Sequence, residues 1–163
     1  MIKAVHDLGF NTIRVPVTWG TMVKDDGSID AAWISRVEDV INYCIDEDMY
    51  VILNAHHDGA DNVGTDKEGK SVHGWLDIGG TDEEFAAVEA KYQKMWASIA
   101  NYFKNYDEHL IFESMNEVYS GSGDTNLQQD MERINKLNKT FGAAVRSTGS
   151  NLSLIHISEP TRH

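Results

Sequence analysis

The segment from Phe112 to Tyr119, FESMNEVY, places two carboxylates and an amide at the end of an apolar run. Because it follows Leu110-Ile111 and precedes a Ser- and Gly-rich stretch, it predicts a short buried strand that ends at Asn116-Glu117 and continues into a loop. Enzymes built on parallel sheets place carboxylates at such strand ends, and an amide can donate to and accept from a ligand hydroxyl. Glu117 is therefore a candidate catalytic carboxylate, the alternative being a solvated or helix-capping residue.

Glu113 precedes Glu117 in the same segment and would share its face in an extended strand. At a rise of about 3.3 Å per residue, the two Cα atoms would lie roughly 13 Å apart, which is too far for two carboxyl groups that act on one bond. We therefore expect Glu113 to be a buried, hydrogen-bonded residue. The catalytic partner of Glu117 must then come from elsewhere.

Arg14 lies on the polar side of a second predicted strand. In Thr12–Val17 the side chains of Ile13, Val15 and Val17 share one face, and Arg14 lies on the other. A buried guanidinium needs a carboxylate or equivalent acceptors. Two interpretations stay open: Arg14 keeps a catalytic carboxylate ionised, or it forms a structural salt bridge at a strand end.

The sequence His56-His57-Asp58 follows a third apolar run, Tyr50–Leu53. Adjacent residues of an extended strand face opposite sides, so the two histidines cannot easily bind one metal ion. A metal site that uses His56 and Asp58 stays open as an alternative. We favour neutral imidazoles that hydrogen-bond a ligand or a neighbouring carboxylate, and the remaining interpretation is a structural histidine pair.

Three aromatic residues lie outside the helical stripes, just beyond strands or in a long loop. They are Trp19, Trp75 and Tyr119. Their ring faces suit the apolar C–H patches of sugar rings, and they are equally suited to anchoring loops. We therefore regard them as candidate sugar-binding residues, with the anchor role as the alternative.

The elements that must position these side chains follow from hydrophobic periodicity. A Gly- and Asp-rich stretch over residues 58–80 is predicted to form a long loop. The element order α-β-α-β-α-β-α favours an α/β fold with a parallel sheet and right-handed crossovers. The predicted helices cover residues 1–9, 30–48, 82–103 and 124–146, and the predicted strands are Thr12–Val17, Tyr50–Leu53 and the run that begins at Leu110.

The amino-acid composition limits the kinds of molecule that the chain is expected to bind. The 163 residues carry a formal net charge of -12, which argues against nucleic acid and anionic membranes, since both attract basic patches. The single cysteine, Cys44, excludes an intrachain disulfide framework and a thiolate metal cluster. A neutral ligand such as a sugar is compatible with this charge.

The chain resembles glycoside hydrolase family 5, of the endoglucanase and xyloglucanase type, over nearly all of Met1–Gly149. The resemblance is carried by the segments Gly9–Trp19, Tyr50–Asp58 and Leu110–Glu117, in this order and spacing. It implies a partial (β/α)8 TIM barrel, roughly strands two to four with their helices. A complete barrel of this kind typically needs about 250 residues, so the chain resembles a truncated fragment.

The resemblance also implies roles for the candidate residues. Glu117 takes the general acid/base position of a retaining glycosidase, and Asn116 contacts the sugar 2-hydroxyl. Arg14 supports the nucleophile, while His56 and His57 line the sugar subsite at the cleavage point. The nucleophilic Glu itself lies outside this chain, so we expect residues 1–163 alone to be inactive.

At the level of the whole protein, the resemblance implies hydrolysis of a β-1,4-glucan-type polysaccharide such as cellulose or xyloglucan. It implies no cofactor and no metal, a secreted enzyme, and a monomer at full length. Two alternatives remain: a non-catalytic carbohydrate-binding half-barrel, and a metal-dependent barrel hydrolase that uses His56 and Asp58.

The C-terminal residues have two alternative interpretations. Pattern alone allows a strand in Leu152–Ile157. The eleven residues Leu152–Arg162 also resemble the translation of a transposase adapter used in sequencing libraries. We therefore expect residues 1–149 to form the partial catalytic domain and residues 150–163 to be a non-native tail in which His156 and Glu159 have no chemical role.

Overall fold

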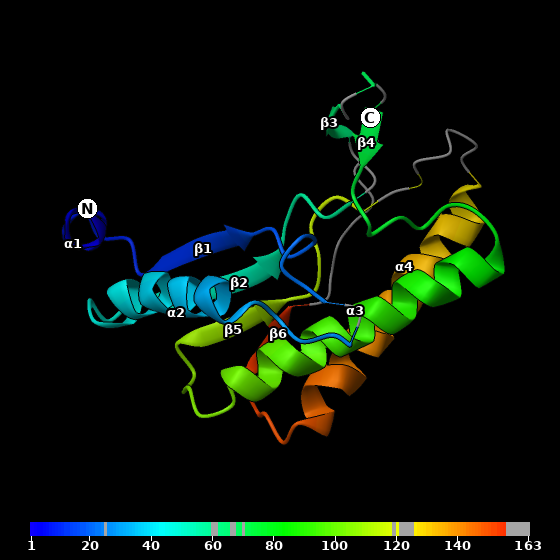
Figure 1. The fold of residues 1–163 in the computed structure, drawn as a ribbon. Helices are drawn as coiled ribbons and strands as arrows, with labels where there is room; N and C mark the ends of the chain where they lie inside the picture. Colours follow the sequence, from blue (N-terminus) through cyan, green and yellow to red (C-terminus); the bar gives the residue numbers. More distant parts are fainter. Residues whose placement is uncertain are drawn as a thin grey trace.

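The computed structural model describes residues 1–24, 26–59, 62–65, 68–69, 71–118, 120 and 126–155. Four parallel strands form the central sheet in the order β1(Thr12–Val17), β2(Tyr50–Ala55), β5(Leu110–Glu113) and β6(Ser153–Ile155) (Figure 1). Each strand pairs in parallel with its neighbour. The α/β class and the parallel sheet predicted from the element order are therefore confirmed.

The helices begin where the sequence supplies capping groups. The carboxylate of Asp30 accepts hydrogen bonds from two backbone amides at the start of α2(Ala31–Ile45). Thr81 and Glu84 form a reciprocal capping box at the start of α3(Asp82–Tyr102). The other helices are α1(Ile2–Asp7) and α4(Leu127–Ser147), and none of the helices in the described ranges is long and apolar enough to cross a membrane.

The hydrophobic core lies between the sheet and the helices that cover one of its faces. The Trp96 ring of α3 is fully buried and packs 5.6 Å from the Phe112 ring of β5 and 4.6 Å from the Phe141 ring of α4, measured between centroids. Figure 1 shows α3 and α4 side by side along this face. Ile52 and Ile111, whose side chains have the opposite parity, are only partly covered.

Arg133 of α4 forms hydrogen bonds to the segment that precedes α3 and to the first residue of α3. Its Nη1 donates to the carbonyl oxygens of Ile78, Gly79 and Gly80 at 2.7, 2.9 and 3.1 Å. Its Nη2 donates to the Asp82 carboxylate at 2.8 Å. Since only 5% of Arg133 is exposed, these bonds satisfy a buried charge that would otherwise oppose folding.

The structure departs from the predicted elements in the long loop and near the C-terminus. The stretch predicted as a long loop contains an antiparallel hairpin of β3(Asn62–Thr65) and β4(Ser71–His73). The strand allowed by pattern near Leu152 is present as β6, which pairs with β5 and adds a fourth parallel strand to the three expected. The domain boundary at residues 149–150 and the adapter origin of the tail stay predictions, and residues 156–163 lie outside the described ranges.

Candidate active site

Arg14, in the middle of β1, reaches the carboxyl end of β5, a strand that is not its neighbour. Its Nε and Nη2 donate to the two carboxylate oxygens of Glu113 at 2.7 and 2.8 Å, and Nη2 also donates to Oδ1 of Asn116 at 2.9 Å. Because β2 lies between β1 and β5, the long guanidinium side chain crosses Ile52 of β2 to reach them. The hydrogen bond to Glu113 raises the pKa of Arg14 further.

Glu113 is hydrogen-bonded, as predicted, but it is half-buried, with 19% of its side chain exposed. A carboxylate that accepts two bonds from one guanidinium is held in a fixed orientation. The structure thus contains the salt bridge that one of the two interpretations requires, and a role of Arg14 toward a catalytic carboxylate stays a prediction. The bond to Asn116 shows in addition that Arg14 orients a residue next to Glu117.

Glu117 lies beyond the end of the strand rather than within it. β5 ends at Glu113, and the backbone of Asn116 donates to the carbonyl oxygen of Ala55 at 3.0 Å, which fixes this segment against the end of β2. Glu117 is exposed and has a positive φ of 43°. The expectation that the strand runs on to Glu117 is wrong, so the separation worked out for an extended backbone does not apply. The negative charge of Glu117 acts on both Arg14 and His56.

His56 and His57 lie closer together than an extended backbone would allow. β2 ends at Ala55 and His57 adopts a φ of 56°, so the alternation of side chains stops before the pair. The two rings meet edge to face with 4.3 Å between centroids. Burial lowers the pKa of His56, and the neighbouring His57 and Arg14 lower it further, which favours the neutral imidazole expected from the sequence.

Asp58 is buried, with 2% of its surface exposed, and its carboxylate accepts three hydrogen bonds. The donors are the backbone amides of Trp19 and Gly20, at 2.8 and 2.6 Å, and the indole of Trp75 at 3.0 Å. Burial raises the pKa of Asp58, and these bonds oppose the rise. Both oxygens are thus engaged by N–H groups, and the described residues contain no cluster of three or more side chains suited to a metal ion. The geometry does not favour the metal alternative.

The three candidate aromatic residues have different surroundings. Trp19 is fully buried, and its indole donates to the carbonyl oxygen of Asn54 at 3.0 Å; a ring without exposed surface cannot stack on a sugar. Burial therefore supports the anchor interpretation of Trp19, which we leave out of the sugar site. Trp75 is half-buried, with the Lys91 ammonium 4.5 Å from its ring centroid. Tyr119 lies outside the described residues.

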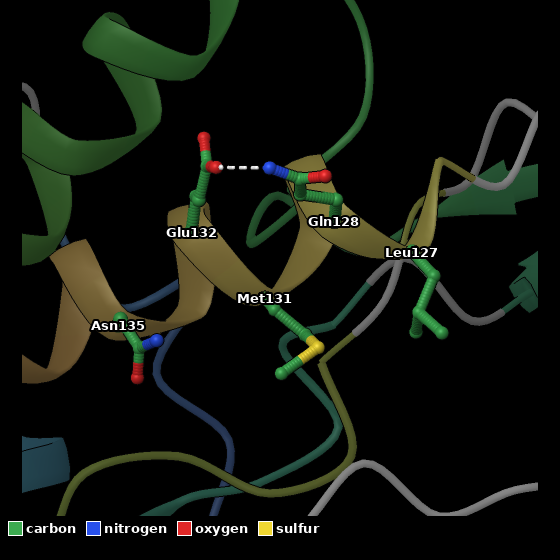
Figure 2. A pocket seen from close by; sticks show the side chains of 5 residues that line it. All are labelled: Leu127, Gln128, Met131, Glu132 and Asn135. Atoms are coloured by element: carbon green, nitrogen blue, oxygen red, sulfur yellow. Dashed lines mark hydrogen bonds between the residues drawn. The ribbon is translucent and has the colours of Figure 1, made fainter.

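A hollow of about 530 Å³ lies away from these residues, on the outer surface of α4. Figure 2 shows Leu127 and Met131 projecting from one side of this helix, while the Gln128–Glu132 hydrogen bond of 3.1 Å lies on the other side. None of the candidate site residues that the structure describes lines the hollow. The candidate site is instead at the carboxyl edge of the sheet, where Arg14, Asn116 and the histidines meet.

A parallel sheet with arginine, amide, carboxylate and imidazole groups at its carboxyl edge has the arrangement of the active-site face of α/β-barrel enzymes. Comparison with known proteins agrees. The family model for cellulase, glycosyl hydrolase family 5, matches residues 1–161. The chain therefore belongs to glycosyl hydrolase family 5, and its sheet with the covering helices is part of a (β/α)8 barrel.

The relatives are longer than this chain. Endoglucanase B of Clostridium cellulovorans is 40% identical over 169 aligned residues, which cover 99% of this chain and 34% of the relative. Endoglucanase A of Ruminococcus albus is 39% identical, with 93% and 39% coverage. The chain thus spans between a third and two fifths of the length of these two curated relatives.

Solved structures give the same result. A family 5 xyloglucanase from Paenibacillus pabuli, in complex with a ligand, superposes with a TM-score of 0.80 at 37% identity and covers 94% of this chain and 42% of its own. A family 5 enzyme of Prevotella bryantii, in complex with a xyloglucan tetradecasaccharide, has a TM-score of 0.79 at 30% identity, with 94% and 43% coverage.

The sequence did not reveal what Asp58 binds. It suggested only a possible metal ligand, whereas the structure shows a carboxylate shared by two loops. The partners Trp19 and Trp75 lie 39 and 17 positions away, and no periodicity relates a residue after one strand to a residue after another. An acidic residue shortly after an apolar run was the one available signal, and it names no partner.

Proposed function

We propose that this chain supplies the acid/base side of the active site in a retaining glycosidase. The observation that carries the proposal is the constellation around Arg14, in which one guanidinium binds Glu113 and orients Asn116 beside the exposed Glu117. The constellation lies at the carboxyl edge of the sheet in a family 5 chain, where barrel enzymes bind their substrates.

The proposed chemistry assigns one task to each group. Glu117 protonates the leaving glycosidic oxygen and then removes a proton from the attacking water. Because Oδ1 of Asn116 accepts from Arg14, its amide N–H groups are oriented to donate to a sugar hydroxyl. His56, kept neutral by its lowered pKa, and His57 would contact the sugar at the cleavage point. Glu113 is held by Arg14, so we assign the nucleophile to a residue outside this chain.

We propose a β-1,4-glucan as the substrate class, with xyloglucan included. Support comes from the relatives' names, endoglucanases and a xyloglucanase, and from structures solved with a xyloglucan tetradecasaccharide and with a cellotriose. The half-buried Trp75 is the remaining described candidate for contact with a sugar ring. Polymers of this size do not enter cells, so we also propose that the full-length enzyme acts outside the cell, without a cofactor and as a monomer.

The test needs a complete barrel, because the chain spans about a third of its relatives. In a chimera, residues 1–149 replace the matching segment of the Clostridium cellulovorans Endoglucanase B. We expect the chimera to hydrolyse xyloglucan or a soluble cellulose, and residues 1–163 alone to show no hydrolysis. Glu117→Gln should lower kcat by about 10²–10⁴-fold, the range for loss of a general acid/base.

Two further measurements identify the role of Glu117 as acid/base. Aryl glucosides with a dinitrophenolate leaving group need no protonation, so the loss in their first step should be much smaller. Azide should restore turnover in Glu117→Ala by replacing the water that needs a base. Glu83→Gln, an exposed carboxylate in the first turn of α3, is the matched control and should be neutral. Full activity of Glu117→Gln in an active chimera would exclude the proposal.

A binding function without catalysis gives a different pattern. If the constellation only holds sugar, cello-oligosaccharides will bind residues 1–163 with an affinity that Glu117→Ala leaves unchanged and Trp75→Ala abolishes. Titration calorimetry on the three proteins distinguishes this pattern from that of the catalytic proposal.

A further inference from the structure

We propose that Asp58 and Gly59 form a positioning element for Glu117. The side chain of Asp58 joins the loops after β1 and β4, while the backbone of Gly59 packs against the peptide of Glu117. The inference rests on the proposed role of Glu117 as acid/base and extends it to residues that touch neither substrate nor reacting atoms.

The Asp58 carboxylate joins segments that are distant in sequence. Trp19 and Gly20 follow β1, and Trp75 follows β4, yet all three donate to the same buried carboxylate. A side chain added at Gly20 would place its Cβ 2.8 Å from Oδ1 of Asp58 and 2.7 Å from Cδ1 of Trp75. This close approach requires glycine and fixes the loop directly against the carboxylate.

The backbone after Asp58 continues the connection to Glu117. The carbonyl oxygen of Asp58 accepts from the amide of Leu76 at 2.7 Å, and Gly59 forms an isolated parallel bridge with Leu76. On its other side, a Cβ at Gly59 would lie 3.1 Å from the carbonyl oxygen of Glu117, closer than ordinary van der Waals contact. A Cβ at Gly74 would overlap the carbonyl oxygens of Gly59 and Asp58. Gly59 is therefore enclosed between Gly74 and the segment that carries Glu117.

The backbone conformations around this element need external support. His57 and Glu117 are both left-handed, with φ of 56° and 43°, a region that residues with a Cβ seldom occupy. His57 directly precedes Asp58, and the carbonyl oxygen of Glu117 lies 3.1 Å from the position that a Cβ of Gly59 would take. Such conformations persist where packing and hydrogen bonds over-determine them. The Asp58–Gly59 element supplies both kinds of restraint at the point where the two segments meet.

The charge of Asp58 fits a fixed anchor. Burial raises its pKa, whereas the three N–H donors and the charge of Lys91 oppose the rise. Lys91 projects from α3 over the Trp75 ring, 4.5 Å from its centroid. The carboxylate is thus surrounded by donors and by one cation on the described elements that pack against it.

The first test uses residues 1–163 labelled with ¹⁵N and ¹³C. Asp58→Asn places an amide N–H against N–H donors and disrupts the anchor without loss of volume. Gly59→Ala inserts a methyl group against the Glu117 carbonyl. The matched controls are Asp26→Asn, an exposed carboxylate that bonds Ser28, and Gly142→Ala, where the methyl meets nothing within 4 Å.

We expect Asp58→Asn to shift the Trp75 indole and Gly20 amide signals directly. If the inference is correct, Asp58→Asn and Gly59→Ala also shift the backbone and carboxyl signals of Glu117, although Asp58 does not touch Glu117 with its side chain. The controls leave these signals in place. Unchanged Glu117 signals in both variants would overturn the inference, since Asp58 would then anchor only its own loops.

The second test measures kinetics in the chimera and applies also where a variant of the isolated chain gives no dispersed spectrum. A displacement of Glu117 by about 1 Å should lower kcat on xyloglucan by up to about 10²-fold with little change in KM. The loss should be smaller on a dinitrophenyl glucoside, whose departure needs no proton. Equal losses on both substrates would overturn the inference and indicate general destabilisation. If the loss of activity in Glu117→Gln itself does not depend on the leaving group, the proposed acid/base function of Glu117 is wrong. The NMR spectra still test whether Asp58 and Gly59 position Glu117.

Discussion

The Arg14–Glu113 pair offers a quantitative test of the candidate site. Arg14 donates to both oxygens of Glu113 at 2.7 and 2.8 Å across the intervening strand β2. Arg14→Met removes the donors, and Glu113→Gln removes the charge and converts one acceptor into a donor. The two variants and their combination form a double-mutant cycle that isolates the interaction between the side chains.

The exposure of the two side chains sets the expected magnitude. A charge-assisted hydrogen bond contributes about 1.5–3 kcal/mol, whereas a solvent-exposed ion pair contributes about 0–1 kcal/mol. Because 38% of the Arg14 side chain and 19% of the Glu113 side chain are exposed, solvent screens part of the interaction. We expect a coupling free energy of about 1–2 kcal/mol, between these limits.

Urea unfolding of residues 1–163, followed by circular dichroism, measures the coupling. The matched control is the Lys3–Asp7 pair of α1, which has the same shortest distance of 2.7 Å but side chains 67% and 56% exposed. Its coupling, from Lys3→Met and Asp7→Asn, should stay below about 0.5 kcal/mol. A value for Arg14–Glu113 no larger than the control would refute the argument that burial and two-point geometry make this pair strong.

Two further predictions concern pH and stability. Burial lowers the pKa of His56, so its imidazole signals, assigned by comparison with His56→Gln, should titrate below the usual value of about 6.5. The folded state then binds fewer protons than the unfolded state, so the contribution of His56 to stability is present above about pH 6.5 and is lost as the pH falls through the lower, folded-state pKa; a midpoint at or above 6.5 would contradict this. Arg133→Met leaves the carbonyl oxygens of Ile78, Gly79 and Gly80 without their donor and should lower the free energy of unfolding in urea by about 2–4 kcal/mol. Arg36→Met, which removes an exposed arginine 3.6 Å from Asp39, should change it by less than about 0.5 kcal/mol, and equal effects of the two arginine variants would show that the Arg133 bonds add nothing.

Local sequence determined most of the fold. A helix was predicted over residues 30–48, and α2 lies within this range with Ile34, Val37, Ile41 and Cys44 buried at helical spacing. Asp30, the first residue of that range, is the N-cap of the helix. These features depend on side-chain periodicity and on hydrogen bonds within a few residues, so they can be read without knowledge of the tertiary structure.

Tertiary structure decided where the strands end. From the sequence, the third strand was predicted to run to Glu117, and the side chains of His56 and His57 were expected to face opposite sides of an extended strand. In the structure, β5 ends at Glu113 and β2 ends at Ala55. His57 and Glu117 have left-handed backbone conformations, yet neither is a glycine or an asparagine, the residue types from which such a conformation could be predicted. Contacts with other loops hold these conformations, and such contacts are not encoded in a local pattern.

The candidate site shows the same division. Residue types and strand ends were enough to select Arg14, Asn116 and Glu117, because the carboxyl ends of parallel strands meet at one edge of a sheet. The pairing of Arg14 with Glu113, 99 positions away, and the burial of Trp19 depended on strand register and loop packing. Sequence thus determined which groups reach the edge of the sheet. Only the tertiary structure decided which of them touch, because hydrogen bonds and burial depend on distances between segments that lie far apart along the chain.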